Sequence, residues 1–144
     1  MNYLWMMSRI IALDFGLKRI GIAITDESNK LAFGLETVDY KDIIRILKKK
    51  ITDYNVETIV VGKPIKMNNT PSLIEPNILK FIQKIKKQFD MIKIERYDER
   101  FTSILAKKAI ANSGLKKNKK KDKRLVDKIS ATLILQSYLK NKEI

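Results

Sequence analysis

The hydrophobic positions at the start of the chain fall into three short runs that are typical of β-strands. These runs cover residues 9–14, 19–25 and 31–38, and a turn near Gly16 separates the first two. Apolar runs joined by short turns predict hairpin pairing, so we expect these three strands to be antiparallel. The first run is apolar up to its last residue, Asp14, whose carboxylate is costly to bury unless a cation meets it.

The rest of the chain alternates between helix-like and strand-like segments. Apolar residues recur every three to four positions after Asp39, which predicts a helix to about residue 54 with Asp39 as its cap. The wholly apolar, β-branched run at 58–61 is typical of a buried central strand. The remaining predicted elements are a helix from Glu75-Pro76, a strand at 91–97, a helix at 102–112 and a final helix at 125–140.

This order of elements predicts one α/β domain over residues 1–144. Helices that connect strands give parallel pairing, so we expect a mixed five-stranded sheet with helices on both faces. Ligands of such sheets bind near the carboxyl ends of the strands. Asp14, Gly62 and the pair Asp98-Glu99 all follow strand ends there.

The chain has no cysteine and no histidine, which removes several kinds of chemistry. Thiolate metal sites, disulfides and Ser-His or Cys-His mechanisms are excluded. Catalysis would have to use carboxylates, lysines, hydroxyls or a metal ion held by oxygen. No apolar stretch reaches the length of a membrane span, and no secretory signal is evident, so we expect a cytoplasmic protein without membrane contact. We hypothesise that translation starts at Met6 or Met7, because residues 1–7 precede the first strand.

The formal net charge of +14 favours a polyanionic partner, and nucleic acid is the first candidate. A lysine-rich codon usage is the alternative explanation. Residues 115–124 are too charged to pack and predict a mobile basic loop that could contact phosphates. Other bases lie in the turn after Asp14 and beside the strand ends, where an ordinary solvated turn is again the alternative. The candidate nucleic-acid contacts are Lys18, Arg19, Lys63, Lys66, Arg100, Lys116, Lys117, Lys119, Lys120, Lys121, Lys123 and Arg124.

Three acids stand where they could converge on one site: Asp14, Glu99 and Asp127. Carboxylates that share a site repel one another, so their ionised forms need a cation. Ligands that are all oxygen favour Mg²⁺ or Mn²⁺, and two such ions about 4 Å apart would assist phosphodiester hydrolysis. Simpler roles remain open at this point. Asp127 could be a favourable contact at a helix N-terminus, and Glu99 could pair with Arg96 or Arg100 at the surface.

Together these segments resemble the YqgF/RuvX family, whose RNase H-like fold is shared with RuvC-type Holliday junction resolvases. The resemblance spans residues 8–140 in order. It is carried by residues 12–23 (ALDFGLKRIGIA), 59–64 (IVVGKP), 98–103 (DERFTS), 126–131 (VDKISA) and 134–139 (ILQSYL).

The resemblance implies a nuclease that matures the 5′ end of pre-16S ribosomal RNA, with Asp14, Glu99 and Asp127 as its catalytic, metal-binding acids. The central loop departs from the family pattern, which usually has an apolar residue at Lys63 and an acid at Asn68. The resemblance therefore gives that loop no metal role.

Three other functions remain as alternatives. A resolvase that cuts four-way DNA junctions would share the site and would be expected to form a symmetric dimer, whereas an RNA nuclease could be a monomer or a homodimer. A non-catalytic RNA-binding assembly factor could use the same fold. The pattern Asp14-x-Gly16 also occurs in ATPases of the actin and sugar-kinase type, but these need a second similar domain, for which this chain has no room.

Overall fold

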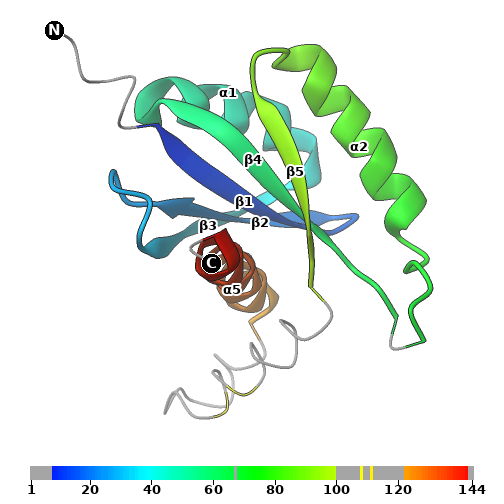
Figure 1. Ribbon diagram of the computed structural model, residues 1–144. Coiled ribbons are helices and arrows are strands. Elements are labelled where there is room, and N and C mark those ends of the chain that lie inside the picture. The colour runs from blue at the N-terminus through cyan, green and yellow to red at the C-terminus, as the bar shows by residue number, and fades with distance from the viewer. Residues whose placement is uncertain (1–7, 67, 100–107, 109–110, 112–121, 143–144) are drawn as a thin grey trace, which may run out of the picture.

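The computed structural model describes residues 8–66, 68–99, 108, 111 and 122–142 (Figure 1). Five strands in this part of the chain form one sheet: β1 (Arg9–Phe15), β2 (Arg19–Thr25), β3 (Ala32–Asp39), β4 (Val56–Lys63) and β5 (Lys93–Asp98). The helical elements that accompany them are η2 (Tyr40–Asp42), α1 (Ile43–Tyr54), α2 (Glu75–Gln88) and α5 (Lys123–Lys142).

The strands lie in the order β3-β2-β1-β4-β5, which confirms the predicted mixed sheet. β1, β2 and β3 pair in antiparallel order, whereas β4 is parallel to both β1 and β5. Parallel pairing follows from the crossovers, because a chain that leaves one strand end through a helix re-enters the sheet in the same direction. The central strands β1 and β4 are apolar on both faces, as the short runs in the sequence predicted.

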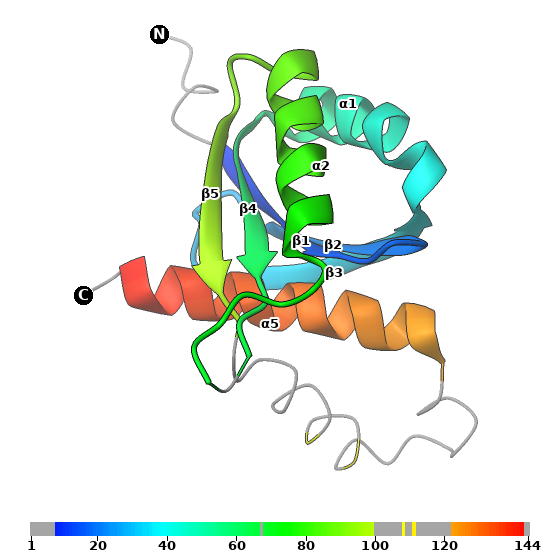
Figure 2. The same ribbon diagram turned by 90° about the vertical axis from the view of Figure 1, so that its right-hand side faces the viewer.

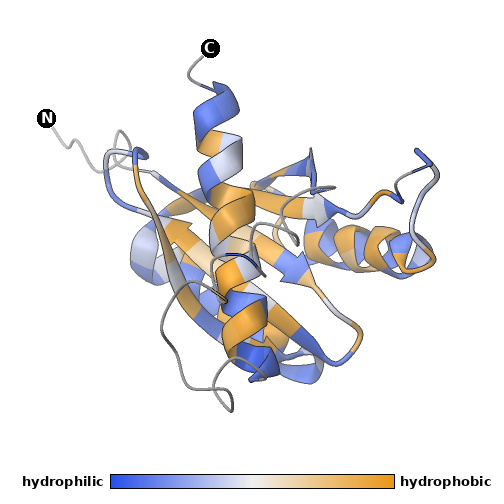
Figure 3. Cartoon of the chain, turned by 90° about the horizontal axis from the view of Figure 1, so that it is seen from below, coloured by the Kyte–Doolittle hydropathy of each residue, from blue (hydrophilic) through white to orange (hydrophobic). Residues whose placement is uncertain are grey.

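The helices cover opposite faces of the sheet (Figures 1 and 2). The face under α1 and α2 is filled by large side chains, among them Ile11, Leu13, Ile59 and Phe81. The other face has smaller residues such as Ala12, Ala23 and Val60, and one long helix, α5, packs there. Figure 3 shows α5 crossing this face, with hydrophobic residues along its middle turns and hydrophilic ones at its C-terminal end.

Two predicted boundaries were wrong. Asp39 does not cap α1: it is the last residue of β3, the 3-10 turn η2 follows it, and its carboxylate accepts a 2.5 Å hydrogen bond from Arg124. The final helix begins at Lys123, so Lys123 and Arg124 belong to α5 and not to a loop. The Asp122 carboxylate accepts hydrogen bonds from the backbone N–H groups of Arg124 and Leu125, which makes the earlier start possible.

Three sequence predictions concern residues outside the described part of the chain. They are the start of translation within residues 1–7, the helix at 102–112 apart from residues 108 and 111, which are helical, and the basic loop up to residue 121. Within the described helices, none has both the length and the apolar character needed to cross a lipid bilayer.

Candidate active site

The alternation of side chains along β1 directs Asp14 toward α5. Ile11 and Leu13 point to the face under α1 and α2, and the Phe15 ring packs there against Tyr40 and Phe81. Because successive residues of a strand point to opposite faces, Asp14 shares the α5 face with Ala12. Its carboxylate therefore stands on the side of the sheet where α5 crosses.

A glycine on β4 makes room for the second acid. A Cβ on Gly62 would lie 2.1 Å from Glu99 Oε2, so the Glu99 carboxylate rests directly on this glycine. Glu99 reaches that place because its backbone N–H donates to the Lys63 carbonyl at 3.2 Å, which extends the β4–β5 pairing by one residue. The site thus gains an acid from the residue that follows β5.

A glycine on β2 sets the position of the third acid. A Cβ on Gly21 would lie 2.1 Å from the backbone oxygen of Asp127, so α5 lies against the sheet at this point. Gly21 is also the residue of β2 that pairs with Asp14. The packing of α5 on this glycine therefore brings Asp127 next to Asp14.

The pKa of Asp14 responds to both of the other acids. Burial raises the pKa of Asp14 well above its usual value, and the negative charges of Glu99 and Asp127 raise it further. Burial also raises the pKa of Glu99 to about 7, although the nearby Arg96 guanidinium opposes the rise. Both groups are thus held where the ionised form is unfavourable, and a cation would relieve this.

The third acid, Asp127, pairs with Arg19, which follows the turn after Asp14. Arg19 Nε donates a hydrogen bond of 3.3 Å to Asp127 Oδ2. Burial raises the pKa of Asp127, and the contact with Arg19 works against that rise. Because α5 begins at Lys123, Asp127 lies in its second turn, so the alternative of a contact at the helix N-terminus is wrong.

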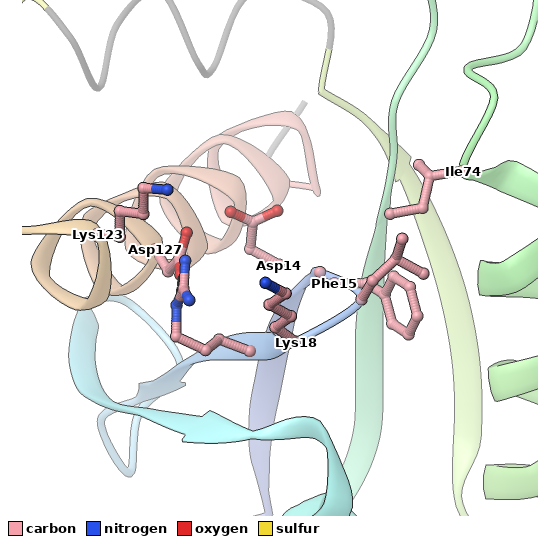
Figure 4. Close-up of a pocket in the computed structure, with 9 residues that line it drawn as sticks. Asp14, Phe15, Lys18, Ile74, Lys123 and Asp127 are labelled. Atoms are coloured by element: carbon pink, nitrogen blue, oxygen red, sulfur yellow. Dashed lines mark hydrogen bonds and ion pairs between the residues drawn. The ribbon is translucent and has the colours of Figure 1, made fainter.

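Asp14 and Asp127 border a hollow of about 400 Å³ at the carboxyl end of β1. Lys18 lines the same hollow, and Figure 4 shows Lys123 and Asp127 on the α5 side of the opening. Phe15 and Ile74 bound the hollow on the side away from α5 (Figure 4). The hollow therefore presents acids at its base and bases at its rim.

The structure brings together some of the predicted basic contacts but not all of them. Lys18, Arg19 and Lys123 line the hollow with the acids. Lys63 ends β4, and Lys66 lies in the loop beyond it. Arg124 is turned to β3, where it donates to the Thr37 carbonyl at 2.9 Å as well as to Asp39. Arg100 and Lys116, Lys117, Lys119, Lys120 and Lys121 lie outside the described residues.

Sequence reasoning missed a buried ion pair behind the site. Arg96 donates two hydrogen bonds, of 2.9 and 2.8 Å, to the carboxylate of Glu75, a residue that is only 7% exposed. The same guanidinium donates to the carbonyls of Val61 and Gly62 at 3.2 and 3.0 Å. Arg96 therefore fixes the end of β4 from the opposite face, and its main partner is Glu75. No sequence motif indicated this pair, because Glu75 and Arg96 are 21 positions apart, in α2 and β5.

The donors of the site fit a hard divalent cation in chemical type. Asp14, Glu99 and Asp127 offer only carboxylate oxygens, which Mg²⁺ and Mn²⁺ prefer, and burial disfavours their ionised forms. In residues 8–66, 68–99, 108, 111 and 122–142, however, no three such side chains stand close enough to surround one ion. In this arrangement of the acids, Asp127 is paired with Arg19.

Comparison with known proteins gives one family match that covers nearly the whole chain. Residues 8–141 match the family described as "RuvX: Holliday junction resolvase". Curated relatives carry the description "Putative pre-16S rRNA nuclease". The one from Christiangramia forsetii is 47% identical over 133 residues, which is 92% of this chain and 98% of the relative. The one from Flavobacterium psychrophilum is 47% identical over 136 residues, which is 94% and 99% of the two chains.

Solved structures agree on the fold. RuvC of T. thermophilus in complex with a Holliday junction substrate has a TM-score of 0.58 at 12% identity, and the match covers 94% of this chain and 96% of that one. The yeast mitochondrial Holliday junction resolvase Ydc2 has a TM-score of 0.50 at 8% identity, with coverages of 95% and 82%. These likenesses confirm the predicted RNase H-like α/β fold, and the curated relatives confirm the predicted class of nuclease.

Proposed function

Because this chain belongs to the RuvX family of Holliday junction resolvase-like proteins, we propose that it is a metal-dependent endonuclease that acts on structured RNA. Its substrate is the pre-16S ribosomal RNA precursor, cut at the 5′ end of the mature sequence. The observation that carries the proposal is the position of Asp14, whose pKa is raised by burial and by the charges of Glu99 and Asp127. The relatives described as pre-16S rRNA nucleases support RNA as the substrate.

Asp14, Glu99 and Asp127 would hold Mg²⁺ or Mn²⁺, which when bound would neutralise the acids and polarise the scissile phosphate. Apolar residues at the positions of these three acids would stabilise the fold more than buried carboxylates do. A local loss of stability of this kind is typical of functional sites. Gly21 and Gly62 support the same site, because their missing side chains leave room for Asp127 and Glu99 on the face of the sheet where Asp14 lies.

The bases at the rim of the hollow would bind the phosphate oxygens. Lys18 lines the hollow together with Asp14, and Lys123 lies on the α5 side of the opening (Figure 4). Cations placed where negative charge builds up in the transition state lower the barrier to phosphoryl transfer. Arg19 would orient Asp127 through its 3.3 Å hydrogen bond. Positive charge at the rim and negative charge at the base would thus align the RNA backbone over the acids.

The test is cleavage of a 5′-labelled pre-16S precursor RNA in Mg²⁺ by the wild-type chain and by Asp14→Asn. We expect discrete cleavage by the wild type and a loss of at least about a hundredfold in the variant, since one catalytic group commonly contributes that much. Asp90→Asn is the matched control, because it makes the same chemical change at an exposed residue beyond α2. It should cut like the wild type.

Four-way junction DNA serves as the competing substrate in the same assay. Cleavage of the junction at a rate above that of the precursor would assign the site to DNA. Cleavage of RNA that is equal in the wild type and Asp14→Asn would remove Asp14 from the mechanism. Salt-sensitive RNA binding without any Mg²⁺-dependent cleavage would leave a binding protein on a nuclease fold.

A further inference from the structure

The end of β4 supports one of the three acids, and its pairing with β1 stops short of that point. Gly62 is buried and lies one residue beyond Val61, the last residue of β4 that pairs with β1. Glu99 depends on this strand end twice, because its carboxylate lies over Gly62 and its backbone N–H donates to the Lys63 carbonyl at 3.2 Å. Any shift of the end of β4 would therefore move the Glu99 carboxylate as well.

Arg96 holds this strand end from the opposite face of the sheet. It lies on β5 two residues after Ile94, which packs under α1 and α2, so its side chain points to that face too. Its Nε donates to the Val61 carbonyl at 3.2 Å, and its Nη2 donates to the Gly62 carbonyl at 3.0 Å. The guanidinium thus gives hydrogen bonds to the backbone directly beneath the Glu99 carboxylate.

Glu75 keeps the guanidinium in this place. The Nη1 and Nη2 atoms of Arg96 donate to its two carboxylate oxygens at 2.9 and 2.8 Å, a bidentate geometry that fixes the plane of both groups. Glu75 is the first residue of α2, and Ile74 before it borders the hollow that contains Asp14. The ion pair therefore also ties the start of α2 to the end of β4.

Stability alone does not explain a buried ion pair at this point. Apolar side chains of similar size often stabilise a fold as well as a buried pair does, or better. They cannot replace its direction, because the guanidinium is a rigid plane whose N–H groups point at fixed angles. The four hydrogen bonds of Arg96 thus hold α2, β4 and β5 in one arrangement.

We propose that Arg96 is a positioning residue for Glu99. By holding the Val61 and Gly62 carbonyls it fixes the glycine over which the acid lies, and Glu75 locks the guanidinium. The pair thereby sets where the Glu99 oxygens lie relative to the other two acids, from the face of the sheet that the acids do not occupy. The use of Glu99 as a metal ligand rests on the proposed function, whereas the hold of Arg96 on β4 does not.

The test compares the wild type with the double variant Glu75→Leu/Arg96→Met. This variant leaves the net charge unchanged and buries no lone charge, so it should fold and should be more stable than Arg96→Met alone. Hydrogen exchange followed by NMR measures the strand end directly. Relative to the amide of Ile22, buried in β2, the amides of Gly62 and Glu99 should exchange at least about fivefold faster than in the wild type.

Titration with Mn²⁺ measures the effect on the acid. The double variant should bind the ion at least about fivefold more weakly, because groups that orient metal ligands contribute to metal affinity. Arg96→Lys should also bind weakly, since one ammonium keeps the charge but cannot hold two carbonyls and a carboxylate in one plane. The matched control is Glu36→Leu/Lys50→Met, which removes the ion pair between β3 and α1 and should change neither the relative exchange nor the affinity.

The proposal is overturned if the relative exchange of Gly62 and Glu99 is equal in the wild type and the double variant. Equal changes in the double variant and the control, or wild-type Mn²⁺ affinity in Arg96→Lys, would also overturn it. A wild-type chain that binds no Mn²⁺ would refute the metal site of the proposed function. In that case the exchange rates alone decide: faster exchange at the end of β4 in the double variant, and not in the control, still assigns Arg96 its role there.

Discussion

Replacing Glu99 by glutamine should make the protein more stable at neutral pH, although it removes an acid that the proposed mechanism needs. The Glu99 carboxylate lies over Gly62, where Ile134 of α5 also approaches the sheet. Burial raises its pKa to about 7, from an ordinary value of 4.5. Glutamine has the same shape and no charge, so the variant removes the cost of ionisation together with the smaller attraction to Arg96.

The size of the effect follows from the shift in pKa. Below about pH 4.5 the group is protonated in both the folded and the unfolded chain, and its ionisation costs nothing. Between about 4.5 and 7 the unfolded chain loses its proton while the folded chain keeps it, so the wild type loses about 1.4 kcal/mol of stability per pH unit. Above about pH 7 the loss reaches its full value, about 3 kcal/mol, as an upper estimate.

The assay is urea unfolding of the wild type and Glu99→Gln in EDTA, at steps from about pH 4 to about pH 8. The difference in the free energy of unfolding should be near zero at the acid end and should grow in favour of the variant toward pH 8. Glu57→Gln, at an exposed residue of β4, is the control and should show no such growth. A Glu99→Gln variant that is less stable than the wild type at pH 8, or a difference independent of pH, would refute the reasoning.

Two further predictions concern the residues that support the acids. Gly62→Ala should fold with a loss of less than about 1.5 kcal/mol, because its Cβ meets the mobile end of Glu99, yet it should reduce precursor cleavage strongly. Gly21→Ala puts its Cβ 2.1 Å from a backbone oxygen of α5, so its loss in urea unfolding should be larger, about 1–3 kcal/mol; equal losses in the two variants would contradict this. Arg96→Met leaves the Glu75 carboxylate buried without its partner and should cost about 3 kcal/mol, and the double variant with Glu75→Leu should recover part of that loss. If the single variant unfolds at the wild-type urea concentration, the ion pair does not stabilise the fold.

Much of the fold could be predicted because it follows from the period of the apolar residues. The apolar run that ends at Asp14 located β1, and the wholly apolar run at 58–61 identified a central strand. The mixed pairing followed from the connections, whereas the order of the strands in the sheet was seen only in the structure. Boundaries were harder to predict, because they depend on contacts between distant residues. Asp39 looks like a helix cap in the sequence. In the structure it ends β3, and its carboxylate accepts a hydrogen bond from Arg124, 85 positions later.

The candidate acids were visible in the sequence, whereas the ion pairs around them were not. A carboxylate at the end of an apolar run is visible in the sequence, since burying it is costly. Gly21 and Gly62 could have been recognised, because a glycine inside a strand often marks a close approach of another segment. The pairs Arg19–Asp127 and Arg96–Glu75 had no local signal, because each depends on how α5 or α2 packs on the sheet.

The central claim is that Asp14, Glu99 and Asp127 together form a cation site, and direct titration of the chain with Mn²⁺ tests it. The account predicts that Asp14→Asn weakens Mn²⁺ binding at least about tenfold, and that Mn²⁺ raises the thermal midpoint of the wild type but not of this variant. Asp90→Asn should bind the ion like the wild type. Equal Mn²⁺ affinity in the wild type, Asp14→Asn and Asp90→Asn would contradict the account.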